Sequence, residues 1–211
     1  MTRALEERQG VKLQEKFASA VAAVCGLGGL GSNIALSLAR AGIGKLILID
    51  FDQVDVSNLH RQQYKASQVG AYKTEALTAC LKEIAPYIEL ETHTVRMTEA
   101  NTVALLKDAK DADVICEAFD NAECKAMLVN IVLEQMPSKY LVAASGMAGI
   151  DSANLIQTRK VMEVIVWSLK VKQTEISHSP LTTALQMPVL LLVHPHVDMA
   201  VSFSHYACIV S

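Results

Sequence analysis

Short apolar runs alternate with stretches of helical periodicity along the chain, from about residue 21 to residue 145. The runs are typical of buried strands, and the segment at residues 89–95 alternates apolar and polar side chains as half-buried strands do. The predicted strands are residues 21–25, 45–50, 89–95, 114–116 and 140–144. The predicted helices between them are residues 32–40, 70–85, 98–107 and 124–135.

This order of elements predicts an α/β fold with a doubly wound, mostly parallel sheet, because parallel neighbours are joined by helical crossovers. In such sheets, ligands bind where the strands end, at the carboxyl edge. Three features follow or end a predicted strand. They are the glycine-rich stretch that begins after Cys25, the acid Asp50 and the acid Asp120. We therefore expect these residues to lie at one edge of the sheet.

The last part of the chain breaks this pattern. No glycine follows Gly149, and Glu175 and Asp198 are the only charged side chains between residues 173 and 211. The same segment holds four of the six histidines and three of the five prolines. We expect an α/β domain with an N-terminal helix over residues 1–161 and an atypical apolar tail over residues 162–211. Two explanations of the tail stay open, a divergent native segment and an out-of-frame C-terminus.

Composition narrows the class of protein. With 51% apolar and 19% charged residues, the chain can form a full-sized core, which excludes a disordered protein. A net charge of −3 gives no reason to expect a nucleic acid or an anionic membrane as partner. No signal-peptide core or membrane-length apolar run is present, so we expect a cytoplasmic protein. The five cysteines form no Cys-x-x-Cys pair, so we expect neither zinc nor a disulfide framework.

The stretch from Cys25 to Gly31 is a glycine loop between a predicted strand and a predicted helix. Gly26, Gly28 and Gly31 have the G-x-G-x-x-G spacing, which lets the backbone turn tightly and approach a phosphate. Asp50 ends the next predicted strand, where an acid commonly accepts a hydrogen bond from a ribose hydroxyl. These features predict a Rossmann-like nucleotide-binding fold. They fit an NAD-dependent oxidoreductase as well as an adenylating enzyme.

The segment after Asp50 favours phosphate chemistry. Asn58, Arg61 and Lys73 follow this acid closely, and fixed cations stabilise phosphates that gain charge during transfer. A solvated basic face would contain the same residue types, so that alternative stays open. Asp120 follows another predicted strand, where its carboxylate is placed to hold Mg²⁺, to cap the next helix, or both.

Together these motifs resemble the ThiF/MoeB adenylyltransferases, the bacterial relatives of ubiquitin-activating enzymes. The resemblance covers about residues 5–160 and rests on Gly26-Leu-Gly-Gly-Leu-Gly31, Asp50-Phe-Asp-x-Val-Asp-x-Ser-Asn-Leu-x-Arg-Gln62, Lys73 and Asp120-Asn121. Many members hold zinc with cysteine pairs that this chain lacks. The chain therefore most resembles the short ThiF proteins of thiamine biosynthesis. The resemblance implies adenylation, with ATP and Mg²⁺, of the C-terminal glycine carboxylate of a small ubiquitin-like sulfur-carrier protein that ends in Gly-Gly.

The resemblance also implies roles for individual residues and an assembly. Family members are homodimers in which an N-terminal arginine reaches the partner's site, and Arg8 is the match here. A tRNA-modifying dehydratase of the same superfamily and an inactive carrier-binding scaffold stay open as alternatives. The implied roles are phosphate binding for Gly26, Gly28, Gly29 and Gly31, nucleotide contact for Asp50 and Asp52, phosphate contact for Asn58, Arg61 and Lys73, and Mg²⁺ binding for Asp120.

Overall fold

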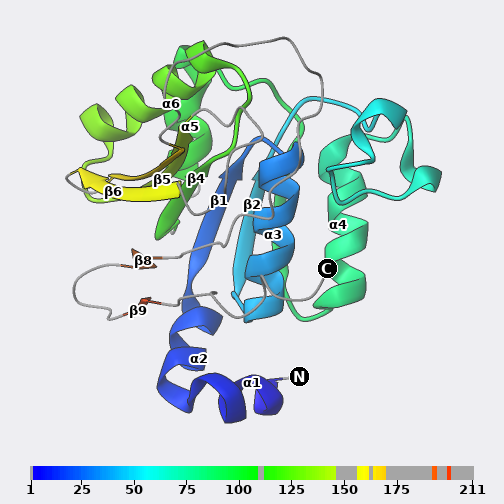
Figure 1. The fold of residues 1–211 in the computed structure, drawn as a ribbon, viewed down its shortest axis with the longest axis vertical. Coiled ribbons are helices and arrows are strands. Elements are labelled where there is room, and N and C mark those ends of the chain that lie inside the picture. Colours follow the sequence, from blue (N-terminus) through cyan, green and yellow to red (C-terminus); the bar gives the residue numbers. More distant parts are fainter. Residues whose placement is uncertain are drawn as a thin grey trace.

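The computed structural model describes residues 2–108 and 112–145, together with four strands at residues 156–161, 164–169, 192–193 and 199–200. A seven-stranded sheet with the order β3-β2-β1-β4-β5-β7-β6 forms the centre of the molecule (Figure 1). Its strands are β1 (Val21–Cys25), β2 (Lys45–Ile49), β3 (Glu89–His93), β4 (Val114–Glu117), β5 (Tyr140–Ser145), β6 (Ile156–Val161) and β7 (Val164–Leu169).

The first five strands pair in parallel in the order 3-2-1-4-5, which is the doubly wound arrangement. This confirms the predicted fold class. β7 also runs parallel to β5, and β6 pairs with β7 antiparallel. The boundary predicted at residue 161 therefore falls between two paired strands. β8 (Leu192–Val193) and β9 (Met199–Ala200) form a separate antiparallel pair, and the rest of the predicted tail lies outside the described residues.

Helices cover both faces of the sheet, and α3 (Gly29–Ala41) and α4 (Lys73–Ile84) lie on the opposite face from α5 (Glu99–Asp108) and α6 (Ala122–Gln135) (Figure 1). Side chains of β1 alternate between the two cores. Ala22 and Val24 belong to one core, whereas Ala23 and Cys25 belong to the other. A strand that is covered on both faces needs apolar side chains at every position, which explains the continuous apolar runs of the sequence.

Helix boundaries differ from the predictions where the backbone is constrained. The helix predicted from residue 70 begins at Lys73, because Gly70 has a left-handed φ of +88° that a helix cannot contain. The predicted N-terminal helix is two helices, α1 (Thr2–Gln9) and α2 (Val11–Ser19), separated by Gly10 at φ +86°. Among the helices of the described ranges, none has the length and apolar character to cross a membrane.

Candidate functional site

The connection between β1 and α3 is the glycine loop, and its shape requires glycine at two positions. Gly26 has φ +92°, and a Cβ on it would lie 2.9 Å from the backbone oxygen of Ala118. A Cβ on Gly31 would overlap the backbone oxygen of Gly26, so α3 starts pressed against the loop. The first N–H groups of a helix have no partner within the helix and favour an anion. The start of α3 is therefore a candidate phosphate site.

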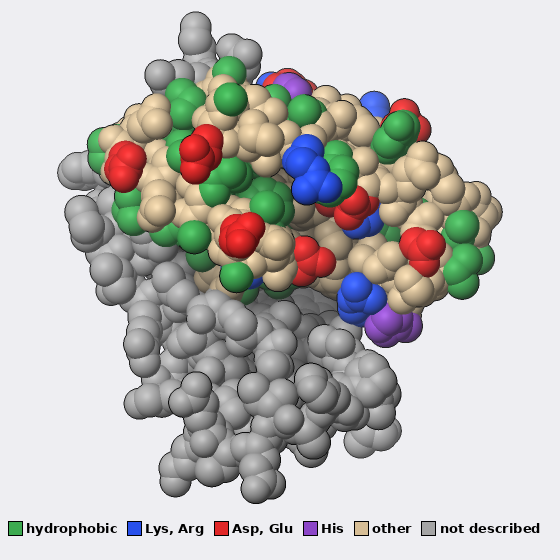
Figure 2. Space-filling model, turned by 90° about the horizontal axis from the view of Figure 1, so that it is seen from above, with side chains coloured by type: hydrophobic (Ala, Val, Ile, Leu, Met, Phe, Trp, Pro, Cys, Tyr) green, Lys and Arg blue, Asp and Glu red, His purple; other side chains and the backbone are tan. Residues whose placement is uncertain are grey.

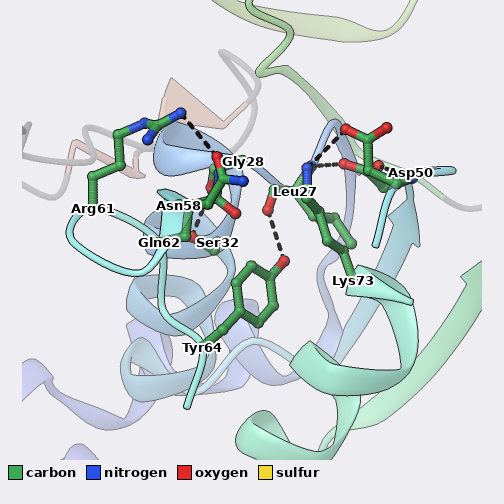
Figure 3. Close-up of polar contacts among 10 residues, drawn as sticks. Leu27, Gly28, Ser32, Asp50, Asn58, Arg61, Gln62, Tyr64 and Lys73 are labelled. Carbon is green, nitrogen blue, oxygen red and sulfur yellow. Dashed lines mark hydrogen bonds and ion pairs between the residues drawn. The ribbon is translucent and has the colours of Figure 1, made fainter. Parts of the chain in front are cut away.

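Asp50 braces the glycine loop from the end of β2. Its Oδ2 accepts the backbone N–H of Leu27 at 2.6 Å (Figure 3). Its Oδ1 accepts the backbone N–H of Asp52 at 2.8 Å. The side chain is buried, with 8% of its surface exposed. Each carboxylate oxygen has two lone pairs, so Asp50 can brace the loop and still accept a hydrogen bond from a ligand hydroxyl.

Asn58 and Arg61 lie on the connection between β2 and α4, which folds back beside the glycine loop (Figure 3). Oδ1 of Asn58 accepts hydrogen bonds from Nη2 of Arg61 at 3.1 Å and from Nε2 of Gln62 at 2.9 Å. A Cβ on Gly29 would lie 3.3 Å from Cγ of Arg61, so the arginine stem covers the start of α3. These contacts hold a guanidinium close to the candidate phosphate site.

Lys73 is the first residue of α4 and is only 6% exposed. Its Nζ lies 2.8 Å from Oδ2 of Asp52, and its backbone N–H donates to the Asp52 carbonyl at 2.9 Å. The charge of Asp52 offsets the cost of burying the lysine. The alternative of a solvated basic face is therefore wrong for Lys73, which is fixed at the same edge of the sheet as Asp50.

Asp120 lies exposed on the connection between β4 and α6. It does not cap α6, because Oδ1 of Asn121 accepts the backbone N–H groups of Glu123 and Cys124 at 2.9 Å each. The prediction of a helix cap at Asp120 is wrong by one residue. In the part of the chain that the structure describes, no three His, Cys, Asp or Glu side chains gather as a metal site. The magnesium role of Asp120 stays a prediction.

Glu117, the last residue of β4, is a buried acid that the sequence analysis missed. Both of its carboxylate oxygens lie 3.0 Å from Nζ of Lys125, which also donates to the Ala144 carbonyl at 3.1 Å. Burial raises the pKa of Glu117, and the Lys125 ammonium partly opposes that shift. In the sequence near Glu117, the only sign of a buried acid is that a charged residue ends an apolar run. The lysine that pairs with it lies eight positions further on.

Arg8 is not near the other candidate residues of its own chain. It lies exposed in the last turn of α1, and α1 and α2 lie at the amino end of β1, opposite the glycine loop (Figure 1). A role for Arg8 at the glycine loop therefore needs a second copy of the chain.

Comparison with known proteins places these features in a family. The ThiF family matches residues 2–164. Adenylyltransferase and sulfurtransferase MOCS3 of Anopheles gambiae is 39% identical over 120 residues, which are 56% of this chain and 26% of that protein. Ubiquitin-like modifier-activating enzyme 5 of Gallus gallus is 31% identical over 142 residues, which are 63% of this chain and 36% of that protein. The chain thus spans about a quarter to a third of the length of these relatives.

Solved structures share the fold. The E. coli tRNA N6-threonylcarbamoyladenosine dehydratase TcdA in complex with ATP superimposes with a TM-score of 0.72 at 24% identity, over 81% of each chain. Its complex with AMP gives a TM-score of 0.68 at 29% identity, over 74% of this chain and 63% of that one. Since the family match runs from α1 to the first residue of β7, this chain belongs to the ThiF family, within the ThiF/MoeB superfamily that resembles ubiquitin-activating enzymes.

Proposed function

We propose that this chain uses ATP to adenylate the C-terminal glycine carboxylate of a small ubiquitin-like sulfur carrier, in the thiazole branch of thiamine biosynthesis. A carboxylate oxygen of the carrier attacks the α-phosphorus, and the bond from that phosphorus to the bridging oxygen breaks, so that pyrophosphate leaves with the electron pair. The nucleophile is already an anion and needs no general base. The protein's task is to position the reactants and to offset negative charge.

The observation that carries this proposal is the meeting of the glycine loop with two fixed cations at one edge of the sheet. In this proposal the N–H groups of the loop and of the start of α3 bind phosphate. Arg61, held beside Gly29 by Asn58, offsets charge on the leaving pyrophosphate. Lys73, held by Asp52, supplies a second cation, and Asp50 accepts a ribose hydroxyl.

Mg²⁺ fits this site through a single protein carboxylate, because ATP phosphates and water commonly supply the other ligands. When bound, the ion supplies positive charge to the phosphates. We assign Asp120 to it, since this exposed acid follows the strand beside β1. The variant Asp120→Ala should raise the Mg²⁺ concentration needed for half-maximal activity. Glu134→Ala, an exposed acid near the far end of α6, is the matched control and should leave this requirement unchanged.

The proposed active form is a homodimer in which Arg8 of each copy enters the partner's site. Co-expression of Arg8→Ala and Arg61→Ala chains tests this directly. A mixed dimer contains one site in which both arginines are present. Random pairing should therefore restore about a quarter of wild-type activity, although each variant alone is inactive. If Arg8 acted within its own chain, the mixture would stay inactive.

Exchange of labelled pyrophosphate into ATP tests the reaction itself. The protein with Mg²⁺ and a carrier that ends in Gly-Gly should catalyse exchange, because adenylation is reversible. Exchange that ran equally well without carrier would contradict the assignment. Binding of carrier and ATP with no exchange would support the inactive scaffold. Stabilisation of the fold by NADH instead of ATP would support the oxidoreductase.

The likeness to TcdA keeps a tRNA dehydratase as the second candidate. Figure 2 looks down on the carboxyl edge of the sheet, where acidic and basic side chains are mixed among the described residues. An RNA backbone favours a continuous positively charged surface. The described residues form no such surface in this view. Turnover of ATP that depended on tRNA and not on the carrier would favour the dehydratase.

A further inference from the structure

Three consecutive carbonyl groups of the glycine loop are each held by a side-chain donor. Two of the donors lie on α3, four residues after their acceptors, so their hydrogen bonds are local. The third donor, Tyr64, comes from the connection between β2 and α4. Tyr64 Oη donates to the Leu27 carbonyl at 2.7 Å and Ser32 Oγ to the Gly28 carbonyl at 2.7 Å (Figure 3). Asn33 Nδ2 donates to the Gly29 carbonyl at 2.6 Å.

The bond from Tyr64 fixes the direction of the next N–H group. The Leu27 carbonyl and the Gly28 N–H belong to one planar trans peptide and point in opposite directions. Because Tyr64 holds the carbonyl on one side, the Gly28 N–H is turned to the other. Gly28 is half-buried, and among the described residues the nearest neighbour of a Cβ on it would be Nε2 of Gln62 at 3.9 Å. The described residues therefore leave space for a ligand atom beside Gly28.

The preceding peptide is fixed as well. The Leu27 N–H donates to Asp50, and the Leu27 side chain is fully buried. Leu27 is thus held on its N–H side by an acid and on its carbonyl side by a phenol. Its own N–H group is occupied, so Gly28 is the first residue of the loop after β1 whose N–H can be directed at a phosphate.

We propose that Tyr64 is a positioning residue for phosphate binding, whose hydroxyl holds the Leu27 carbonyl away from the ligand side so that the Gly28 N–H faces a nucleotide phosphate. This rests on the proposed function. A peptide that turned over here would present a carbonyl oxygen, whose partial negative charge repels phosphate. Tyr64 is 8% exposed, and burial, with a smaller contribution from Asp50, raises the pKa of its phenol. The hydroxyl therefore remains a donor at neutral pH.

The variant Tyr64→Phe removes the hydroxyl and keeps the ring. We expect the Kd and KM for Mg·ATP to rise about tenfold, with kcat at saturating ATP within about twofold of wild type, because the lost bond orients a group that binds phosphate before the reaction. Tyr87→Phe is the matched control. The Tyr87 hydroxyl donates to the Ala39 carbonyl at 3.5 Å, at the other end of α3, and its removal should change neither constant.

Amide hydrogen exchange of the nucleotide-free protein gives a measurement that does not depend on ATP. Exchange at Leu27 and Gly28 should be faster in Tyr64→Phe than in wild type, and unchanged in Tyr87→Phe. Wild-type exchange together with wild-type ATP affinity in Tyr64→Phe would overturn the proposal. A wild-type protein that bound no ATP would reject the proposed function and the phosphate role together. If Tyr64→Phe lowered both kcat and the melting temperature and left the affinity for ATP unchanged, Tyr64 would only stabilise the core. That result would also overturn the proposal.

Discussion

Two buried acids flank β1 at the carboxyl edge of the sheet, Asp50 after β2 and Glu117 at the end of β4. They are 8% and 2% exposed, and each accepts the backbone N–H of the residue two positions later. The distances are 2.8 Å from Asp52 to Asp50 and 2.7 Å from Phe119 to Glu117. Their remaining partners differ. Asp50 accepts the N–H of Leu27, whereas Glu117 is paired with the ammonium of Lys125.

The partners of the two acids indicate different uses. Lys125 compensates the charge of Glu117 and ties α6 to the ends of β4 and β5, because it also donates to Ala144. Lys73–Asp52 and Lys125–Glu117 are ion pairs near this edge, whereas Asp50 takes part in no ion pair among the described residues, so its carboxylate is available to N–H and O–H donors. We infer that the β2 side of the edge binds and activates the nucleotide, whereas Glu117 and Lys125 stabilise the fold. Burial alone does not separate the two uses.

The largest expected effect is on the β2 side. Arg61→Ala should lower the rate of pyrophosphate exchange by about 10²-fold or more, because it removes a charge directed at the transition state. Its thermal melt should stay close to wild type, since Arg61 makes polar contacts outside the two cores. Arg40→Ala, an exposed arginine in the last turn of α3, is the control and should keep full activity. If Arg61→Ala exchanged pyrophosphate at the wild-type rate, the β2 side of the edge would not activate the nucleotide.

On the β4 side, the main expected effect is on stability. Glu117→Ala leaves Lys125 without its anion and should lower the free energy of unfolding by about 2–3 kcal/mol, measured by urea denaturation. The double variant Glu117→Leu, Lys125→Met replaces the pair with apolar side chains and should recover most of this loss. Both variants should bind ATP as wild type does while folded. A loss of ATP affinity without a loss of stability would contradict the division between the two sides.

Asp50→Asn, on the β2 side, should change the affinity for ATP more than the stability of the fold. The substitution keeps the shape of the side chain and an oxygen for the Leu27 N–H, but the new NH2 group cannot accept the N–H of Asp52. It also removes the charge that strengthens hydrogen bonds to a ribose hydroxyl. Affinity for ATP, measured by titration calorimetry, should fall about tenfold. Asp113→Asn is the matched control, since Oδ2 of Asp113 accepts the N–H of Val21 at 2.9 Å, at the amino end of β1. Its ATP affinity should not change.

The sheet and the glycine loop could be predicted because their signals are local. The run from Val21 to Cys25 is apolar at every position, and a strand covered on both faces has this pattern. The glycine spacing predicted a tight turn between strand and helix. The left-handed φ of Gly26 and the overlap that a Cβ on Gly31 would cause are the physical reasons for it. The acid at Asp50 follows from the same strand-loop-helix arrangement.

Several contacts at this edge of the sheet could not be predicted, because they depend on how separate elements and loops pack in three dimensions. Tyr64 and Leu27 are separated by 37 positions, and no periodicity relates a phenol in one loop to a carbonyl in another. Lys125 meets Glu117 only because α6 packs beside the end of β4. Asp120 and Asn121 are both good capping residues, and only the backbone decides that Asn121 accepts the helix N–H groups.

The smallest expected effect is a pH dependence that belongs to Glu117. Burial raises its pKa above the ordinary 4.5, and Lys125 lowers it in part. The folded protein therefore holds this proton more tightly than the unfolded chain does. Between 4.5 and the folded-state pKa, the free energy of unfolding should fall as pH rises, relative to Glu117→Gln, which cannot titrate.

Urea denaturation of wild type, Glu117→Gln and Lys125→Met over a series of pH values measures this difference. Removal of the Lys125 ammonium takes away a group that lowers the pKa of Glu117, so in Lys125→Met the fall should extend to higher pH. No such shift is expected from Lys65→Met, whose ammonium pairs with Glu83 elsewhere on the surface. If wild type instead gained stability over Glu117→Gln as pH rose, the attraction of Lys125 would outweigh burial. Glu117 would then be a charged acid like its counterpart on the β2 side, and the two acids would differ in their partners alone.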